Sequence, residues 1–233
     1  MPDKNEKSGF PAVVNRIFQA TRSLGMALVM ATALFVSAGR LDMPFAWLYV
    51  ALHALSMLAV HFVAAPDLRQ EGLRAIAAGR DRLSCLLIPP LSIAYWIIAG
   101  LDTGRFHWSD SVPLSVRVVA LVVYAVSSGL GIWAVYTNRF FSSSVRIQHE
   151  RGHHVVTSGP YQYVRHPGYL AGLLRVLCGC LALGSWVALL AYGGYLFAFL
   201  RRTRLEDRFL HEELAGYAEY AAKVRYRLLP GVW

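Results

Sequence analysis

Five long apolar stretches with almost no charged residues constrain this sequence more than any other feature. Hydrophobic residues make up 56% of the chain and charged residues only 16%, whereas a soluble domain carries about 25% charged residues. The stretches cover residues 23–39, 44–65, 83–101, 118–136 and 168–200. Because a spanning helix needs about 20 mostly apolar residues, they predict a membrane protein and exclude both a disordered chain and an ordinary soluble globule.

The last stretch is too long for a single crossing. One helix over residues 168–200 would be about 50 Å long, against a hydrocarbon core of about 30 Å. We therefore expect two short helices that turn near Gly184 and Ser185. The predicted fold is an all-α, polytopic membrane helix bundle of about six transmembrane segments, the last two of which form a tight hairpin.

The distribution of basic residues predicts the orientation of this bundle. Of the 23 Lys and Arg residues, 19 fall in the two tails and in the second and fourth connections, and three fall in the first and third. Arg175 lies inside the last apolar stretch. By the positive-inside rule, both termini are expected in the cytoplasm. We accordingly expect the basic residues behind the net charge of +9 to face a membrane surface, and we predict no nucleic-acid partner.

Two smaller features complete this picture. Residues 10–22 fit a short amphipathic helix that lies on the membrane face. Cys85, Cys178 and Cys180 all sit in apolar stretches, so we expect neither a disulfide framework nor a thiolate zinc site.

The fourth connection carries four histidines, at positions 149, 153, 154 and 166. Histidines in a polar loop are more often solvated than metal ligands, so no metal site is predicted. Arg165 and His166 precede Pro167, a residue that suits the first turn of a helix. A helix N-terminus favours carboxylates and other anions. The alternative interpretation is interfacial anchoring, which Arg and Tyr commonly provide at membrane boundaries.

The stretch that follows the last apolar segment is strongly charged. Arg202 and Glu206 are four residues apart, so they share one face of a helix that leaves the membrane. The alternative is a solvated helix end with no further role. Arg175 is either a functional intramembrane cation or a residue that snorkels or pairs within the bundle.

Two blocks of sequence resemble the isoprenylcysteine carboxyl methyltransferase family of integral-membrane enzymes, in the style of bacterial members. The first is GHHVVTSGPYQYVRHPGYLAG at 152–172. The second is Arg202-x-x-x-Glu206 followed by EELAGYAEY at 212–220. The resemblance covers about residues 118–233.

The resemblance implies a pocket for S-adenosyl-L-methionine, formed by the fourth connection and the C-terminal tail. The implied cofactor-binding residues are Gln148, His153, His154, Val155, Val156, Tyr161, Arg165, His166, Pro167, Gly168, Tyr169 and Glu206. Arg202 is implied to bind the substrate, and Arg202 and Glu206 are the candidate catalytic residues. A carboxylate or thiolate acceptor needs only positioning and desolvation for an in-line methyl transfer, and an Arg can present a fork to a carboxylate.

These observations divide the chain into a cytoplasmic N-terminal segment (1–22), four transmembrane helices (23–136) and a catalytic region (137–233). The implied function is S-adenosylmethionine-dependent methylation of a lipophilic or prenylated acceptor in contact with membrane lipids, with an isoprenylcysteine-type carboxylate implied by the resemblance. A multi-pass protein of a bacterial inner membrane is expected. Two alternatives stay open: a sterol-reductase-type membrane enzyme that uses a nicotinamide cofactor, and a non-catalytic transporter or assembly protein.

Overall fold

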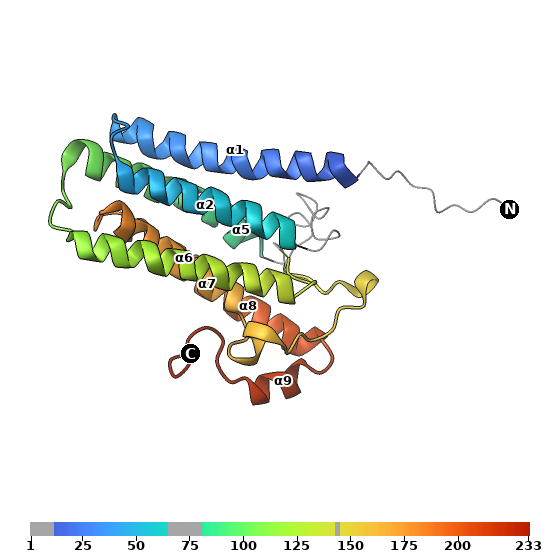
Figure 1. The fold of residues 1–233 in the computed structure, drawn as a ribbon. Helices are drawn as coiled ribbons and strands as arrows, with labels where there is room; N and C mark the ends of the chain where they lie inside the picture. The colour runs from blue at the N-terminus through green and yellow to red at the C-terminus, as the bar shows by residue number, and fades with distance from the viewer. Residues whose placement is uncertain (1–11, 65–80, 143–144) are drawn as a thin grey trace.

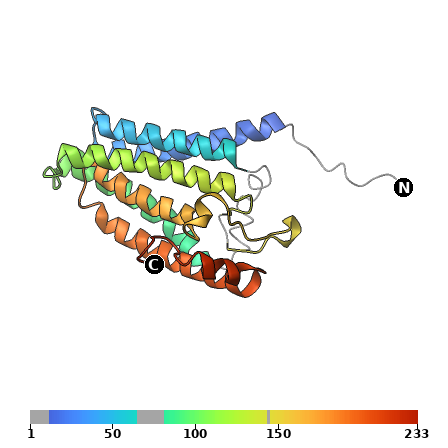
Figure 2. The ribbon, with the colours of Figure 1, turned by 60° about the horizontal axis from the view of Figure 1, so that its bottom comes forward.

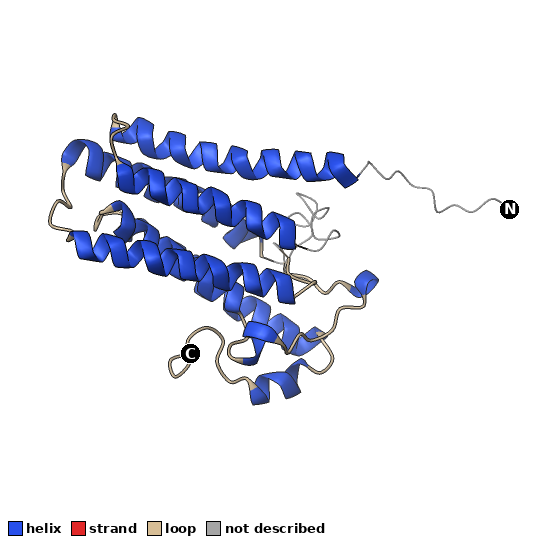
Figure 3. Cartoon of the chain, viewed as in Figure 1, coloured by secondary structure: helices blue, strands red, loops and turns tan. Residues whose placement is uncertain are grey.

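The computed structural model describes residues 12–64, 81–142 and 145–233. These residues are helical with no strand, as Figure 3 shows. The long helices are α1 (Ala12–Ala38), α2 (Pro44–Val63), α5 (Arg82–Leu101), α6 (Leu114–Thr137), α7 (Pro167–Leu183) and α8 (Leu189–Glu213). The short ones are η1 (Asp102–Phe106), η2 (His149–Arg151), η3 (Gly159–Gln162) and α9 (Tyr217–Lys223). Several residues counted for the orientation lie outside the described ranges: Lys4, Lys7, Arg69, Arg74 and Arg80.

The six long helices pack side by side as one bundle (Figures 1 and 2). Helix α6 packs along α7, α1 packs against α2 and α5, and α5 packs against α8. The α1–α2, α5–α6 and α7–α8 connections lie together at one end of the bundle (Figure 1). The described parts of the fourth connection (138–142 and 145–166), the end of α8 and α9 lie at the opposite end (Figure 1).

The outer face of the bundle is apolar, as expected of helices in contact with lipid. Leu28 is 67% exposed, Leu86 71% and Val126 68%, and a water-soluble protein rarely leaves so much apolar surface open. Within the residues that the structure describes, three helical stretches are long and apolar enough to cross a membrane, namely Pro44–Val63, Arg82–Phe106 and Leu114–Thr137. The apolar helices Ser23–Ala38 and Pro167–Leu183 are shorter, and the count of six crossings stays a prediction.

The start of the first helix differs from the sequence expectation. Helix α1 begins at Ala12 and continues without a break to Ala38. The expected separate amphipathic helix over residues 10–22 is therefore wrong for its described part, which forms the first turns of α1. The stretch contains no glycine or proline between Ala12 and Arg22 to end a helix, so helix formation propagates into the apolar segment.

The long apolar stretch breaks at Gly184. This residue ends α7 with a φ of +87°, a left-handed conformation that glycine adopts without a steric penalty. A side chain there would also meet Arg117, whose Nε lies 3.1 Å from the position of an added Cβ. The next residue, Ser185, donates to the buried carboxylate of Asp102, which ties the turn to the α5–α6 connection.

Arg175 pairs within the bundle. Its Nη2 lies 3.2 Å from His53 Nδ1, 3.2 Å from Ser56 Oγ and 3.1 Å from the Tyr124 hydroxyl. The guanidinium also lies over the ring of Tyr124, 5.3 Å from its centroid. Pairing within the bundle, one of the interpretations from the sequence, is thus confirmed, and Arg175 links α2, α6 and α7.

The arrangement of the helix ends makes the orientation testable. We expect a reporter fused after Trp233 and a reporter inserted in residues 107–113 to report opposite sides of the membrane, with the fusion at residue 233 cytoplasmic. Paired alkaline phosphatase and fluorescent-protein fusions measure this directly. The same side for both positions would contradict the predicted topology.

Candidate functional site

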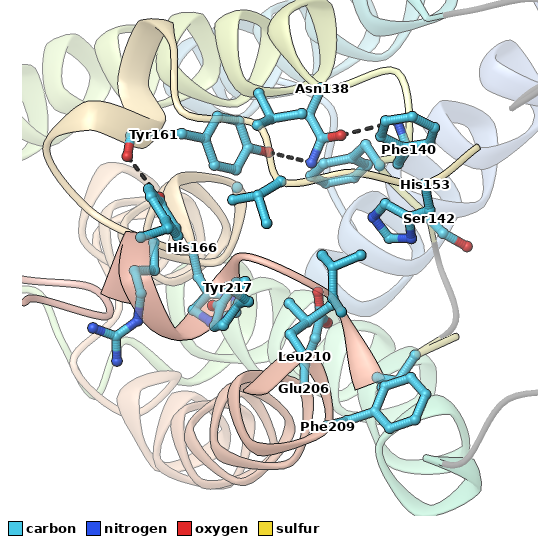
Figure 4. Close-up of a pocket in the computed structure, with 18 of the residues that line it drawn as sticks. Asn138, Phe140, Ser142, His153, Tyr161, His166, Glu206, Phe209, Leu210 and Tyr217 are labelled. Atoms are coloured by element: carbon cyan, nitrogen blue, oxygen red, sulfur yellow. Dashed lines mark hydrogen bonds between the residues drawn. The ribbon is translucent and has the colours of Figure 1, made fainter. Parts of the chain in front are cut away.

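A cavity lies at the end of the bundle where the fourth connection meets α8 and α9 (Figure 4). Its walls enclose about 780 Å³, part of which is open to solvent. The lining residues are Asn138, Phe140, Phe141, Ser142, Val145, Arg146, His153, His154, Val155, Val156, Tyr161, Arg165, His166, Gly168, Tyr169, Glu206, Phe209, Leu210, Leu214, Tyr217 and Tyr220. A cavity with mostly apolar and aromatic walls and a few polar groups is typical of a small-molecule site.

The structure brings most of the sequence-predicted site residues to this cavity. The predicted residues on its wall are His153, His154, Val155, Val156, Tyr161, Arg165, His166, Gly168, Tyr169 and Glu206. Three predicted residues, Gln148, Pro167 and Arg202, are not among the lining residues and are buried. Gln148 and Arg202 bond to the lining residues Phe140 and Tyr169, respectively.

Glu206, Tyr169 and Arg202 form a chain of contacts at the wall of the cavity. The Tyr169 hydroxyl donates to Glu206 Oε2. Arg202 Nε donates to the same hydroxyl at 2.8 Å, and Arg202 is only 5% exposed. The sequence placed Arg202 and Glu206 on one helix face, and the structure adds that Tyr169 from α7 joins them. Arg202 therefore contacts the wall of the cavity at Tyr169.

The carboxylate of Asp207 organises the other side of the cavity. It accepts from Arg165 Nε at 2.7 Å and Nη2 at 3.0 Å, from Arg227 Nε at 2.7 Å and from the Tyr217 hydroxyl at 3.0 Å. His166 Nε2 lies 3.2 Å from the same carboxylate. Asp207 is 1% exposed, and it joins the fourth connection, α8, α9 and the C-terminal tail.

The surroundings of Asp207 keep this carboxylate ionised. Burial alone would raise the pKa of Asp207, but the hydrogen bonds from His166, Arg165 and Arg227 outweigh burial and hold the pKa well below its ordinary value. The fork of Arg165 is thereby taken up by Asp207, and its Nη1 donates to the carbonyls of residues 224 and 225 at 2.8 Å each. Arg165 thus shapes the wall of the cavity rather than presenting a free fork to a ligand.

The C-terminal tail closes over the start of α7. The backbone N–H groups of Arg165 and His166 donate to the carbonyls of Tyr226 and Arg227, each at 2.9 Å. The Tyr220 hydroxyl donates to the carbonyl of Tyr161 at 2.6 Å. These bonds hold the tail against the fourth connection, so the cavity depends on segments about 60 residues apart in the chain.

Gln148 fixes the loop that carries the two neighbouring histidines. Its side chain is completely buried; Nε2 donates to the carbonyl of Phe140 at 2.7 Å and Oε1 accepts from Arg151. The backbone N–H of Gln148 donates to His153 Nδ1 at 3.3 Å. The resemblance implied that Gln148 binds the cofactor; in the structure both ends of its side-chain amide bond to neighbouring residues of this loop.

His153 presents a neutral ring to the cavity. Burial and the nearby His154 and Arg151 lower the pKa of His153 to about 4. Because Nδ1 accepts a backbone N–H, the neutral ring carries its proton on Nε2 and offers a hydrogen-bond donor. The ring stacks on Phe140 with centroids 4.5 Å apart. The pair provides an aromatic surface with one polar edge.

Asp207 was missed by the sequence analysis, which treated the charged stretch around it as one helix face. The available signal was its place directly after Glu206, inside a stretch rich in arginine. Residue type alone did not separate Asp207 from the exposed acidic residues Glu212 and Glu213.

No group of three His, Cys, Asp or Glu residues that could hold a metal ion lies within the ranges that the structure describes.

Comparisons with known proteins agree with the resemblance. Residues 118–212 match the model of the isoprenylcysteine carboxyl methyltransferase (ICMT) family. The chain is 30% identical over 135 residues to the cobalt-zinc-cadmium resistance protein CzcN of Cupriavidus metallidurans, covering 56% of this chain and 57% of that protein. It is 32% identical over 112 residues to a probable protein-S-isoprenylcysteine O-methyltransferase of Oryza sativa subsp. indica, covering 47% and 59%.

A third relative extends the same pattern. The protein-S-isoprenylcysteine O-methyltransferase of Schizosaccharomyces pombe is 32% identical over 92 residues, which is 39% of each chain. The chain therefore spans less than two thirds of the length of each of these relatives. The resemblance of the two sequence blocks to the family is confirmed for residues 118–212, and this match favours a methyltransferase over the reductase and the transporter considered from the sequence.

The Asp207 network generates a stability prediction. We expect Asp207→Asn to lower the free energy of unfolding by about 3 kcal/mol or more, because Arg165 and Arg227 lose the charge that pairs them in a buried site. The folded-state pKa of Asp207 is depressed, so its stabilisation is present above the unfolded pKa of about 3.9 and is lost as the pH falls below it. The difference in the free energy of unfolding between wild type and Asp207→Asn should thus shrink below about pH 4.

Thermal unfolding in detergent between pH 3 and pH 7 measures both effects. Asp110→Asn is the matched control, since the side chain of Asp110 is 72% exposed at the other end of the bundle. If the two variants lost equal, small amounts of stability, or if the stability difference between wild type and Asp207→Asn did not change with pH, Asp207 would not hold the site together.

Proposed function

We propose, from the match of residues 118–212 to the isoprenylcysteine carboxyl methyltransferase family, that this chain is an integral-membrane methyltransferase that uses S-adenosyl-L-methionine. The observation that carries the proposal is the contact between the two family blocks. Tyr169 of the first block and Glu206 of the second are 37 residues apart and bond directly at the wall of one cavity. If the two blocks resembled the family only by chance, their residues would have no reason to contact each other.

The cavity suits the chemical groups of this cofactor. Its cationic and hydroxyl-bearing parts fit the carboxylate of Glu206, and its carboxylate fits the backbone N–H of Gly168 in the first turn of α7. The ring pair Phe140–His153, with the Nε2 donor, suits a flat base with polar edges. Val155 and Val156 add apolar wall.

The reaction requires few groups from the protein. When bound, the cofactor supplies a methyl group on a cationic sulfur. The chain contributes a largely apolar enclosure and the Arg202–Tyr169–Glu206 contacts, which orient the acceptor and limit water at the reacting atoms. Arg202 and Glu206 are the proposed catalytic residues, and Arg202 is the proposed partner of an anionic acceptor.

The acceptor is proposed to be lipophilic. Arg202 lies one turn closer than Glu206 to the apolar part of α8, so an apolar acceptor can remain in the lipid while its reactive end reaches the cavity. The names of the rice and fission-yeast relatives refer to isoprenylcysteine, which supports a prenylated carboxylate as the first acceptor to test. We further propose that residues 137–233 form a catalytic region on the cytoplasmic face of a bacterial inner membrane; the distribution of the basic residues supports the cytoplasmic placement.

Binding of S-adenosylhomocysteine tests the cofactor assignment. Calorimetry on the purified chain in detergent should detect binding, and Glu206→Gln should weaken it about tenfold or more because a charged acceptor is lost. Glu219→Gln, which changes an exposed carboxylate on α9, should leave the affinity unchanged. Absence of binding to the folded wild-type chain would refute the proposal.

Kinetics separate substrate handling from cofactor handling. With an S-farnesylcysteine carboxylate as acceptor, Arg202→Ala should lower kcat by about 10²–10³, by analogy with other positioned donors, and change cofactor affinity far less. Arg202→Lys should restore only part of the rate, because a point charge does not reproduce a planar fork. Arg201→Ala and Arg204→Ala are the comparison variants. Similar small losses for all three would leave Arg202 as one of several interfacial arginines.

A double-mutant cycle tests the contact through Tyr169. If Arg202 acts on the cavity through the Tyr169 hydroxyl, Arg202→Ala should cost much less in a Tyr169→Phe background than in the wild type. Additive losses would indicate that the two side chains act independently.

A further inference from the structure

The segment after α9 ends in a loop that closes on itself. The backbone N–H groups of Arg227 and Leu228 donate to the carbonyl of Trp233, at 2.9 and 3.1 Å. Gly231, with a φ of +81°, takes the left-handed conformation that this tight turn needs and that glycine adopts without a steric penalty. Residues 227–233 therefore form one compact unit, which we call the 227–233 loop.

One side of the 227–233 loop is buried against the bundle and the other is exposed. Leu228 is 3% exposed and belongs to the apolar core of the bundle, and Trp233 packs against that core. On the outside of the loop, Leu229 is 47% exposed and Val232 is 78% exposed. Single exposed apolar side chains are common on protein surfaces, so the position of this tip on the bundle decides what it contacts.

The loop lies where the outer face of α8 passes from apolar to charged. The guanidinium of Arg204 lies over the ring of Trp233, 5.3 Å from its centroid. At about 100° per residue, positions 190, 197 and 204 share one stripe of α8. Leu190 is 78% exposed and Phe197 is 64% exposed, so this stripe belongs to the apolar outer face of the bundle. Arg204 continues it at the end that carries the cavity.

The height of the loop indicates contact with the bilayer. The C-terminus lies alongside the bundle, between its two ends, in both Figure 1 and Figure 2. The guanidinium of Arg227 also lies over the Trp233 ring, 5.2 Å from its centroid. Trp is enriched at membrane–water interfaces, and Arg extends its charge from the edge of the apolar region toward the headgroups. A ring between two guanidiniums, beside lipid-facing helices, fits this boundary.

The base of the loop is fixed to the wall of the cavity. Arg227 Nε donates to Asp207 at 2.7 Å. The carbonyls of Tyr226 and Arg227 accept the backbone N–H groups of Arg165 and His166. Because the base is held in one place, the tip is presented in one orientation, and little conformational entropy remains to be lost when it binds.

We propose that the tip of the 227–233 loop inserts into the bilayer at the interface on the cavity side of the bundle. Leu229 and Val232 enter the boundary between headgroups and acyl chains, and removal of their apolar surface from water favours insertion. Arg204 lies at the level of the phosphate groups, where anionic lipids attract a guanidinium. The partner of this surface is thus lipid, and Arg227 gains an attachment to the membrane beside its bond to Asp207.

Spin labels in lipid nanodiscs test the insertion. Nitroxides on Val232→Cys and Leu229→Cys are probed by power saturation with oxygen, which concentrates in the bilayer, and with a water-soluble nickel chelate. Both labels should favour oxygen, as should a label on Val126→Cys, at an outer-face position of α6 that is 68% exposed. A label on Glu219→Cys, at an exposed position of α9, should favour the nickel chelate. The wild type, treated in parallel, gives the background from its three native cysteines.

Each other outcome overturns the proposal. Preferential access of the nickel chelate at either tip position, as at the Glu219→Cys label, would place the tip in water. Low access of both reagents at either tip position would mean that protein, such as a second copy of the chain, covers it. Thermal unfolding of each variant shows whether it is folded, and if Val232→Cys is not, Leu229→Cys carries the test.

Discussion

The buried carboxylate of Asp207 holds together the part of the structure on which the cavity depends. The fourth connection, α9 and the tail also pack through apolar side chains, among them Val155, Tyr217 and Leu228. Apolar packing is non-directional, so the polar contacts decide how these segments are arranged. Asp207 on α8 is contacted from three different segments, by Arg165 and His166, by Tyr217 and by Arg227. Because a buried charge is costly unless its donors are all in place, the carboxylate allows one arrangement of the three segments and penalises others.

The bundle contributes by holding α8 rigid from its apolar half to its charged half. The helix runs without interruption from Leu189 to Glu213, packs on α5 and α7, and carries Arg202 and Glu206 to the height of Tyr169 at the start of α7. A helix fixes the relative positions of its side chains more precisely than a loop does. Apolar packing several turns away therefore fixes the geometry of the polar contacts in the cavity.

Much of this fold can be predicted from the sequence, but the site only in part. The apolar stretches locate the helices because hydropathy acts over whole segments, and Gly184 marks the break because the conformation there favours glycine. The true start of α1 at Ala12 has no marker, since the polar residues before Ser23 are all compatible with a helix. Gln148 and Asp207 are ordinary polar residues in the sequence. Their importance arises from burial by segments distant in the chain, which local pattern does not encode.

The angular spacing of residues on α8 explains how one helix serves three environments. At about 100° per residue, positions 202, 206 and 210 form one stripe; Glu206 and Leu210 line the cavity, and Arg202 contacts Tyr169 on its wall. Positions 201, 205, 208 and 212 form a second stripe. It contains Arg201, which pairs with Asp81, and Leu205, Arg208 and Glu212, which line a second cavity. Phe209 falls between these stripes and lines both cavities. Asp207 lies on the remaining side, toward the fourth connection and the tail. A one-residue insertion in α8 between Arg201 and Arg202 would turn one part of the helix by about 100° against the other, and would separate Arg201 from the stripe that serves the second cavity.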